Sequence, residues 1–263
     1  MNRLSRPTAL DRGLRFIALV ALFFSTTSDA RAQGNGSSAL VIAYRAKPGE
    51  RAHFRKIMSG DGMEQLRNWK RKGVIADYRA LFTTFAGEDL PDMFLIVRFN
   101  RAKDQERWQR VEETMPGGLP LRAQSIASVL STAVADVVSE EHTVKPTDRS
   151  QYLVSEYDVL VDMPRYSSYF LGYAVPQFQE WEKAGVLSSY EFYINQNPAG
   201  APWGSFVLLE YKDLGALAAR DSVKAKSRVQ LAATNPVWKS WSDDKSTLRR
   251  EKAGIPLRML REP

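Results

Sequence analysis

Segments with alternating or continuous apolar residues, typical of strands, are separated in this chain by segments with apolar residues at helical spacing. Strands are predicted at residues 39–45, 74–85, 93–99, 135–144, 152–161, 187–195, 205–211 and 246–260. Helices are predicted at residues 50–72, 101–115, 121–132, 164–183 and 214–231, with a short one starting at Asn235-Pro236. Each half of the chain therefore follows the order strand, helix, strand, strand, helix, strand.

The two halves also share individual residues at a constant offset of 112 positions. Trp69, Gly73, Val74 and Tyr78 recur as Trp181, Gly185, Val186 and Tyr190. Gly60 recurs as Gly172, and both glycines interrupt a predicted helix. Gly73 follows the last periodic turn of its helix, where a helix-ending glycine is expected. We predict two repeats, residues 39–146 and 151–263.

One repeat of this kind would leave a face of its antiparallel sheet uncovered, and two copies can lay these faces together. We therefore predict an α+β fold in which two tandem ferredoxin-like β-α-β-β-α-β repeats pack their antiparallel sheets into one pseudo-dimeric α/β barrel. Because the pairing is internal, a monomer is expected, and further oligomerisation stays open.

With its strand order, matched helix break and matched helix stop, the chain resembles the dimeric α/β-barrel superfamily in tandem form over about residues 39–260. The resemblance implies the barrel fold and no single activity. The superfamily includes cofactor-independent oxygenases, isomerase-like and degradative proteins, haem enzymes and proteins of no known activity. A shared fold does not transfer a function, and no motif of one member family matches.

The first 32 residues are typical of an export signal. Four arginines precede an apolar core at residues 16–24, and Ala30-Arg31-Ala32 supplies a small-x-small ending. We expect cleavage near Ala32, a flexible leader at residues 33–38, and a soluble mature protein that is periplasmic or secreted. The absence of cysteine favours the periplasm. No later segment approaches the roughly 20 apolar residues of a membrane span, so stable membrane insertion is not expected.

The net charge changes when this segment is removed. The whole chain carries +7, whereas residues 33–263 hold 32 Lys/Arg against 28 Asp/Glu, a net charge of +4. A charge of this size favours solubility and gives no reason to expect nucleic acid as a partner.

Two charged positions have changed sign between the halves. Arg79 and Arg98 align with Glu191 and Glu210. If the two arginines point to one sheet face, a pseudo-twofold axis brings Arg79 near Glu210 and Arg98 near Glu191. We predict ion pairs between the halves, which fix their register more than they add stability. A polar ligand site at the barrel mouth is the alternative.

Aromatic residues gather on the first helix of the second half. They are Tyr166, Tyr169, Phe170, Tyr173, Phe178 and Trp181. Such a stripe is usually core packing, but by the resemblance the space between this helix and the sheet is where small ligands bind. We expect an apolar pocket there, in the second half rather than the first. The candidate ligand-binding residues are Tyr166, Tyr169, Tyr173, Trp181, Tyr190, Trp69 and Tyr78.

Catalytic residues cannot be assigned from the sequence. The two histidines, His53 and His142, have no companions at metal-ligand spacing, and there is no nucleophile elbow or phosphate-binding loop. The second half has no histidine, which argues against a haem enzyme of the chlorite-dismutase-like kind. We expect no metal and no cofactor.

Three functions remain open. The favoured one is an exported protein that binds a small apolar or aromatic molecule between helix and sheet. The second is a cofactor-independent oxygenase or isomerase acting on an aromatic compound, for which Asn68, Trp69 and Tyr78 loosely offer the residue types that the superfamily uses. The third is an interaction module without a ligand. An enclosed pocket with a polar group of shifted pKa would favour the enzyme, an apolar pocket the binder, and a filled core the module.

Overall fold

The computed structural model describes residues 38–101 and 104–261, which belong to one compact unit. The predicted export signal, residues 1–32, and the predicted leader up to residue 37 lie outside the described residues. Within the described residues, no helix combines the length and the hydropathy that crossing a membrane requires.

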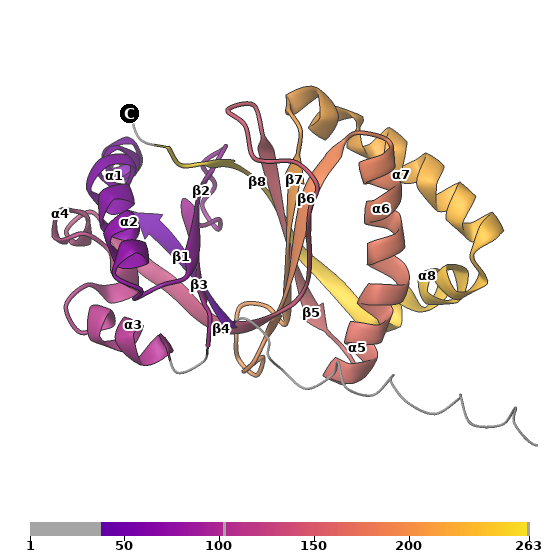
Figure 1. Ribbon diagram of the computed structural model, residues 1–263, viewed down its shortest axis with the longest axis horizontal. Coiled ribbons are helices and arrows are strands. Elements are labelled where there is room, and N and C mark those ends of the chain that lie inside the picture. The colour runs from indigo at the N-terminus through magenta and orange to yellow at the C-terminus, as the bar shows by residue number, and fades with distance from the viewer. Residues whose placement is uncertain (1–37, 102–103, 262–263) are drawn as a thin grey trace, which may run out of the picture. The chain divides into compact units, whose positions relative to one another are not determined.

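The strands of the described residues form one closed antiparallel barrel in the order β1-β3-β2-β8-β5-β7-β6-β4 (Figure 1). The strands are β1 (Ser38–Ala46), β2 (Asp77–Thr83), β3 (Met93–Phe99), β4 (Ala127–His142), β5 (Gln151–Val159), β6 (Leu187–Asn195), β7 (Ser205–Tyr211) and β8 (Arg249–Met259). Within each half, the third strand pairs with the first and second, and the fourth pairs with the first. The halves join through β2–β8 and β4–β6, so the barrel has no open edge.

Helices cover the outside of the barrel, one group over each half (Figure 1). The first group is α1 (Arg51–Ile57), α2 (Met63–Arg71), α3 (Gln105–Glu112) and α4 (Leu121–Gln124). The second group is α5 (Met163–Tyr169), α6 (Val175–Lys183), α7 (Leu214–Thr234) and α8 (Pro236–Leu248). The α+β class and the closed antiparallel barrel confirm the coarse prediction from the sequence.

The predicted helix interruptions are π-helical turns. The segment η1 (Met58–Gly62) joins α1 to α2, and η4 (Phe170–Ala174) joins α5 to α6. Each helix therefore continues through its interruption with a locally widened turn. The predicted helix stop is also confirmed, because Gly73 has a φ of 66° and its counterpart Gly185 a φ of 72°, in the left-handed region.

The helix predicted at residues 121–132 is wrong beyond Gln124. Strand β4 begins at Ala127 and pairs with β1 as far as Asp136. The segment carries Val129, Thr132 and Val134, residue types that suit a pleated strand, and β1 offers it backbone partners with one register shift between Ala43 and Tyr44. Strand β2 likewise starts at Asp77, and β8 starts at Arg249 because α8 runs to Leu248.

Apolar side chains form three layers. One fills the barrel interior and includes Val41, Ile96 and Phe206. The other two lie between the barrel and the helices of each half, around Phe54 in the first half and Tyr169 in the second.

Candidate functional site

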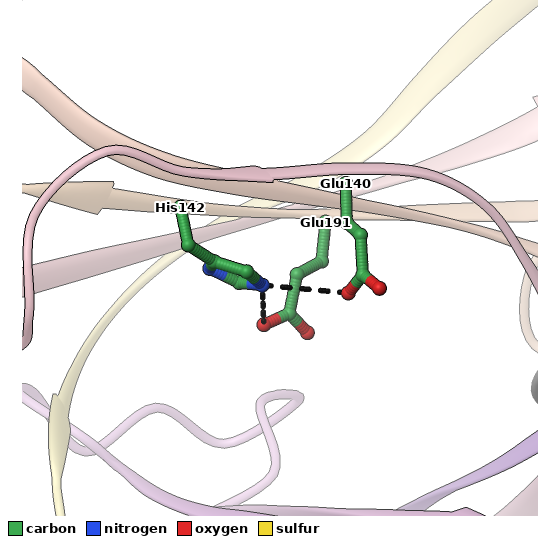
Figure 2. Close-up of side chains that lie close together, drawn as sticks. All are labelled: Glu140, His142 and Glu191. Atoms are coloured by element: carbon green, nitrogen blue, oxygen red, sulfur yellow. Dashed lines mark hydrogen bonds and ion pairs between the residues drawn. The ribbon is translucent and has the colours of Figure 1, made fainter. Parts of the chain in front are cut away.

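A β-bulge in strand β4 changes which of its side chains point into the barrel. Ala133 and Ala135 belong to the barrel interior. The register of β4 against β6 then shifts between Val137 and Ser139. Such a bulge re-aims the side chains that follow it. Figure 2 shows the result: Glu140 and His142 point toward Glu191 of β6.

Two ion pairs neutralise the carboxylates of this barrel-end cluster. Arg79 Nε lies 2.5 Å from Glu191 Oε1, and Glu191 is 1% exposed. The hydroxyl of Tyr193 donates to the other oxygen of Glu191. Arg98 binds Glu140 through both guanidinium ends, at 2.5 and 3.0 Å. The cluster is therefore a charge-balanced network at the end of the barrel interior.

The ion pairs differ from the predicted ones. Arg79 pairs with Glu191, not with the predicted Glu210, and Arg98 pairs with Glu140, where Glu191 had been predicted. Glu210 accepts a hydrogen bond of 3.0 Å from Ser189 Oγ, and its Oε1 has no hydrogen-bond partner among the described residues. The prediction missed the bulge in β4, which turns Glu140 inward, where it binds Arg98.

Glu140, His142 and Glu191 also place three ligand-type atoms within 4.8 Å of one another. His142 Nε2 lies 3.4 Å from Glu140 Oε2 and 3.8 Å from Glu191 Oε1. Hydrogen bonds to His142 and Arg98 lower the pKa of Glu140 to about 2. A divalent cation would have to compete with Arg79 and Arg98 for the same carboxylates and would meet their repulsion. The arrangement therefore favours an ion-pair network over a metal centre.

A second candidate site is a cavity of about 170 Å³ between the helices and the sheet of the second half. We call it the helix–sheet cavity. Phe178, Trp181, Val207 and Leu209 give it apolar walls. Its charged lining consists of Arg220, Lys224, Arg228, Lys245, Arg249 and Glu251. Five cationic side chains thus meet a single carboxylate.

One helix supplies most of these cations. Arg220, Lys224 and Arg228 are spaced four residues apart on α7, so they share one helical face. Arg228 donates to Gln177 Oε1 at 2.9 Å and to the Tyr173 hydroxyl at 3.1 Å. These bonds from α7 to the α6 side hold the Arg228 guanidinium at the cavity.

The remaining cations come from the following helix and strand. Lys245 lies in the last turn of α8 and Arg249 begins β8. The Arg249 guanidinium stands over the Tyr157 ring, 3.9 Å from its centroid, and 5.4 Å from that of Tyr169. Aromatic faces stabilise this cation and leave its charge without a carboxylate partner.

Four of the five cations of the helix–sheet cavity have no carboxylate partner in the described part of the chain, whereas Arg220 pairs with Asp221 at 3.2 Å. Among the described residues, no carboxylate lies within ion-pair distance of Lys224, Arg228, Lys245 or Arg249. Burial, then Arg220 and Arg228, lowers the pKa of the Lys224 amine. Burial, then Arg228 and Arg249, lowers the pKa of Lys245. The cavity therefore has the electrostatics of an anion site.

The structure places most of the aromatic residues singled out in the sequence in packed layers. Of the seven candidates, Trp181 lines the helix–sheet cavity, and its indole donates to Ser227 Oγ at 3.1 Å. Tyr166, Tyr169 and Tyr173 are at most 1% exposed; Tyr169 stacks on Tyr173 and packs at a tilt against Tyr166. Tyr190 packs against Phe178.

The two first-half candidates lie elsewhere. Trp69 packs edge-on against Trp108, and Tyr78 packs partly buried against the same core layer. The structure therefore does not bring the seven residues into one site.

A haem does not fit between the helices and sheet of the second half. Phe170 and Phe192 stack there with ring centroids 3.5 Å apart, and Tyr173 stacks on Trp238 at 5.2 Å. These rings occupy the layer, and a cavity of about 170 Å³ is below the roughly 300–1,000 Å³ usual for pockets of drug-sized ligands. The residues present suit a much smaller ligand.

The cationic cavity was missed at the level of sequence. The signal that could have found it is the spacing of Arg220, Lys224 and Arg228, which puts three cations on one face of a helix. Such a face is normally solvated, and only the packing of α6 and α8 around α7 turns it toward a cavity.

No known protein family and no curated protein matches this sequence. Solved structures do share its fold. A proposed monooxygenase from Fusobacterium nucleatum is similar with a TM-score of 0.54 and 12% identity, over 86% of this chain and 93% of that one. An anthrone oxidase-like protein is similar with a TM-score of 0.52 and 12% identity, over 86% of this chain and 92% of that one. A mutant chlorite dismutase from Candidatus Nitrospira defluvii is similar with a TM-score of 0.52 and 9% identity, over 86% of this chain and 92% of that one. At these identities the likeness shows the fold alone.

Proposed function

We propose that the helix–sheet cavity binds a small organic anion whose body is a single aromatic ring or a short apolar chain. The observation that carries this proposal is that five cationic side chains and one carboxylate line a cavity of about 170 Å³, and that four of these cations have no carboxylate partner among the described residues. Unneutralised charge in a partly desolvated site is unfavourable, and an anionic ligand relieves it. The apolar walls, Trp181 among them, would hold the body of the ligand.

This proposal keeps the location expected from the sequence and changes the ligand class. The expected pocket was apolar because the helix stripe Tyr166 to Trp181 is aromatic. Those rings mainly pack in the core, and the charges of α7, α8 and β8 define the cavity instead. A ligand with both an apolar body and an acidic group suits both features.

The test is a titration of benzoate against benzamide, followed by tryptophan fluorescence, since Trp181 lines the cavity. The two ligands share a ring and differ in charge. Benzoate is expected to bind at least about tenfold more tightly, which corresponds to about 1.4 kcal/mol. Its affinity should fall as salt is added, because screening weakens the attraction.

Two lysines of α8 provide a matched pair of variants. Lys245 lines the cavity, whereas Lys239 is exposed and pairs with Asp243 at 2.8 Å. Lys245→Gln should weaken benzoate binding about tenfold, and Lys239→Gln should leave it unchanged. Equal binding of benzoate and benzamide, or equal loss in both variants, would contradict the proposal.

We also infer that the two halves are tandem repeats forming an internal pseudo-dimer. The supporting observations are the identical strand pairing within each half, the π-helical turns η1 and η4 at matching positions, and the left-handed glycines Gly73 and Gly185. The helix–sheet cavity would then be a specialisation of the second repeat. Expressing residues 39–146 alone tests this inference. A true repeat should self-associate through the edges of β2 and β4, which pair with the other half in the whole chain.

Export is a further proposal, which rests on residues 1–32 alone. If they are a cleaved signal, amino-terminal sequencing of the protein recovered from the periplasm or the medium should begin at or near Gln33. Recovery of an intact amino terminus from the cytoplasm would contradict it.

A further inference from the structure

Lys224 lies at the centre of the cationic face of α7. Arg220 stands one turn before it and Arg228 one turn after it, and all three line the helix–sheet cavity. Lys224 is half-buried, and its amine forms no hydrogen bond or ion pair with any described residue. Its nitrogen is therefore available to a ligand in the cavity.

The surroundings of Lys224 shift its amine toward the neutral form, which is the nucleophilic one. Burial lowers the pKa of its amine, and the charges of Arg220 and Arg228 lower it further. A lysine activated by desolvation or by a second cation is the usual basis of imine formation with carbonyl compounds. Lys245 lines the same cavity and has Arg228 and Arg249 nearby. It lies at the end of α8, however, whereas Lys224 lies between two arginines on one face of α7.

We propose that Lys224 Nζ forms an imine with the carbonyl carbon of the anionic ligand. The substrate class is then an aldehyde or ketone that carries a carboxylate on a single ring or a short chain. This inference rests on the proposed function, because Arg220 and Arg228 must hold the carboxylate for the carbonyl carbon to reach the amine between them.

The step balances without any further reactant. The nitrogen lone pair bonds to the carbonyl carbon while the π electrons of C=O move to oxygen. The nitrogen loses its two protons, the oxygen gains two and leaves as water, and a C=N bond remains. Glu251, the one carboxylate that lines the cavity, is the group placed to pass protons between nitrogen and oxygen.

Para-carboxybenzaldehyde with sodium cyanoborohydride tests the proposal on the whole mature protein. The reductant converts the imine to a stable secondary amine, so the mass should rise by that of the aldehyde less one oxygen atom. Peptide mapping should place the label on Lys224, at a rate at least about tenfold above that of any other lysine. Benzaldehyde, which lacks the carboxylate, should label it at least about tenfold more slowly.

Three variants separate charge from reactivity. Lys224→Arg keeps the positive charge but has no amine, so it should lose the label and still bind benzoate within about threefold. Lys224→Gln should lose the label too. Lys226→Gln, a change at an exposed lysine two positions along α7, should keep both properties. Circular dichroism and the melting temperature confirm that each variant is folded.

The outcomes separate the two proposals. Selective, carboxylate-dependent labelling of Lys224 supports imine formation. Tight benzoate binding without labelling, or with the label on Lys245 or spread over surface lysines, overturns it and leaves the anion site standing. Failure of benzoate to bind overturns the proposed function, and labelling that then shows no preference for the carboxylate overturns this inference as well.

Discussion

Arg79 of β2 and Glu191 of β6 form an ion pair with Nε and Oε1 2.5 Å apart, which joins the two halves inside the barrel end. Their side chains are 17% and 2% exposed. Both charges have therefore lost most of their hydration, and each depends on the other and on nearby polar groups for compensation. The pair ties together two strands that are far apart in the sequence.

Removing one member of this pair should strongly destabilise the fold. Glu191→Gln leaves the Arg79 charge without its partner in a site of low solvent exposure, and we expect a loss of about 3 kcal/mol in the free energy of unfolding. Urea denaturation measures it. The matched control is Lys70→Gln, since Lys70 and Asp77 are 2.6 Å apart but about half exposed. Its cost should stay below about 1 kcal/mol. Equal costs would show that burial does not govern these pairs.

The two π-helical turns should respond differently to the same substitution. A Cβ at Gly172 would lie 2.6 Å from Trp241 Nε1, whereas one at Gly60 meets no atom within 4 Å. Gly172→Ala should therefore cost about 1–3 kcal/mol through overpacking. Gly60→Ala should be neutral or stabilise the protein by up to about 1 kcal/mol. Melting temperatures of the two variants test the contrast, which an equal shift would refute.

The helix stop at Gly185 gives a test of backbone strain alone. Its φ is 72°, and a Cβ placed there contacts nothing within 4 Å. Gly185→Ala should cost about 1 kcal/mol because an L side chain disfavours this conformation. Gly185→Asn should cost less, since asparagine tolerates the left-handed region. Urea unfolding of both variants measures the difference, and an alanine variant as stable as the parent would contradict the argument.

Glu156 should make stability decrease as the pH rises. Burial raises its pKa from 4.5 to about 7, with Lys252 opposing the shift. Between these values the unfolded chain loses the proton while the folded protein keeps it, so folding loses free energy as pH increases. The slope is at most about 1.4 kcal/mol per pH unit. Glu156→Gln should flatten the pH profile of stability between pH 4.5 and about 7.

The control for this prediction is Glu113→Gln, which removes one negative charge from an exposed position at the end of α3. It should leave the profile as in the parent. If the stability of Glu156→Gln still decreases fully as the pH rises, other groups cause that decrease.

How far the sequence predicts this protein depends on the range of the interaction. Strands β3, β6 and β7 match their predicted bounds, because their apolar runs and flanking turns are local signals. The start of β4 was missed because residues 127–132 become a strand only through pairing with β1. Propensity in such a segment yields to the available backbone partners.

The candidate sites depend on longer-range contacts. Arg79 was predicted to pair with Glu210 and Glu191 with Arg98, whereas Arg79 and Glu191 pair with each other, since one bulge in β4 brings Glu140 to Arg98. Trp181 lines the second-half cavity, whereas the cations that characterise this cavity come from α7, α8 and β8. No single segment of the sequence shows that these cations come together.

The sequence by itself determined the order of strands and helices, the glycine stops at Gly73 and Gly185, and the barrel class. Backbone conformation and apolar periodicity set these features within a few residues of chain. The tertiary structure alone decided where charge meets charge, because Arg249 and Lys224 reach one cavity only after the sheet has closed and the helices have packed on it. Burial there removes the water that would otherwise screen them, and that converts five dispersed cations into an anion site.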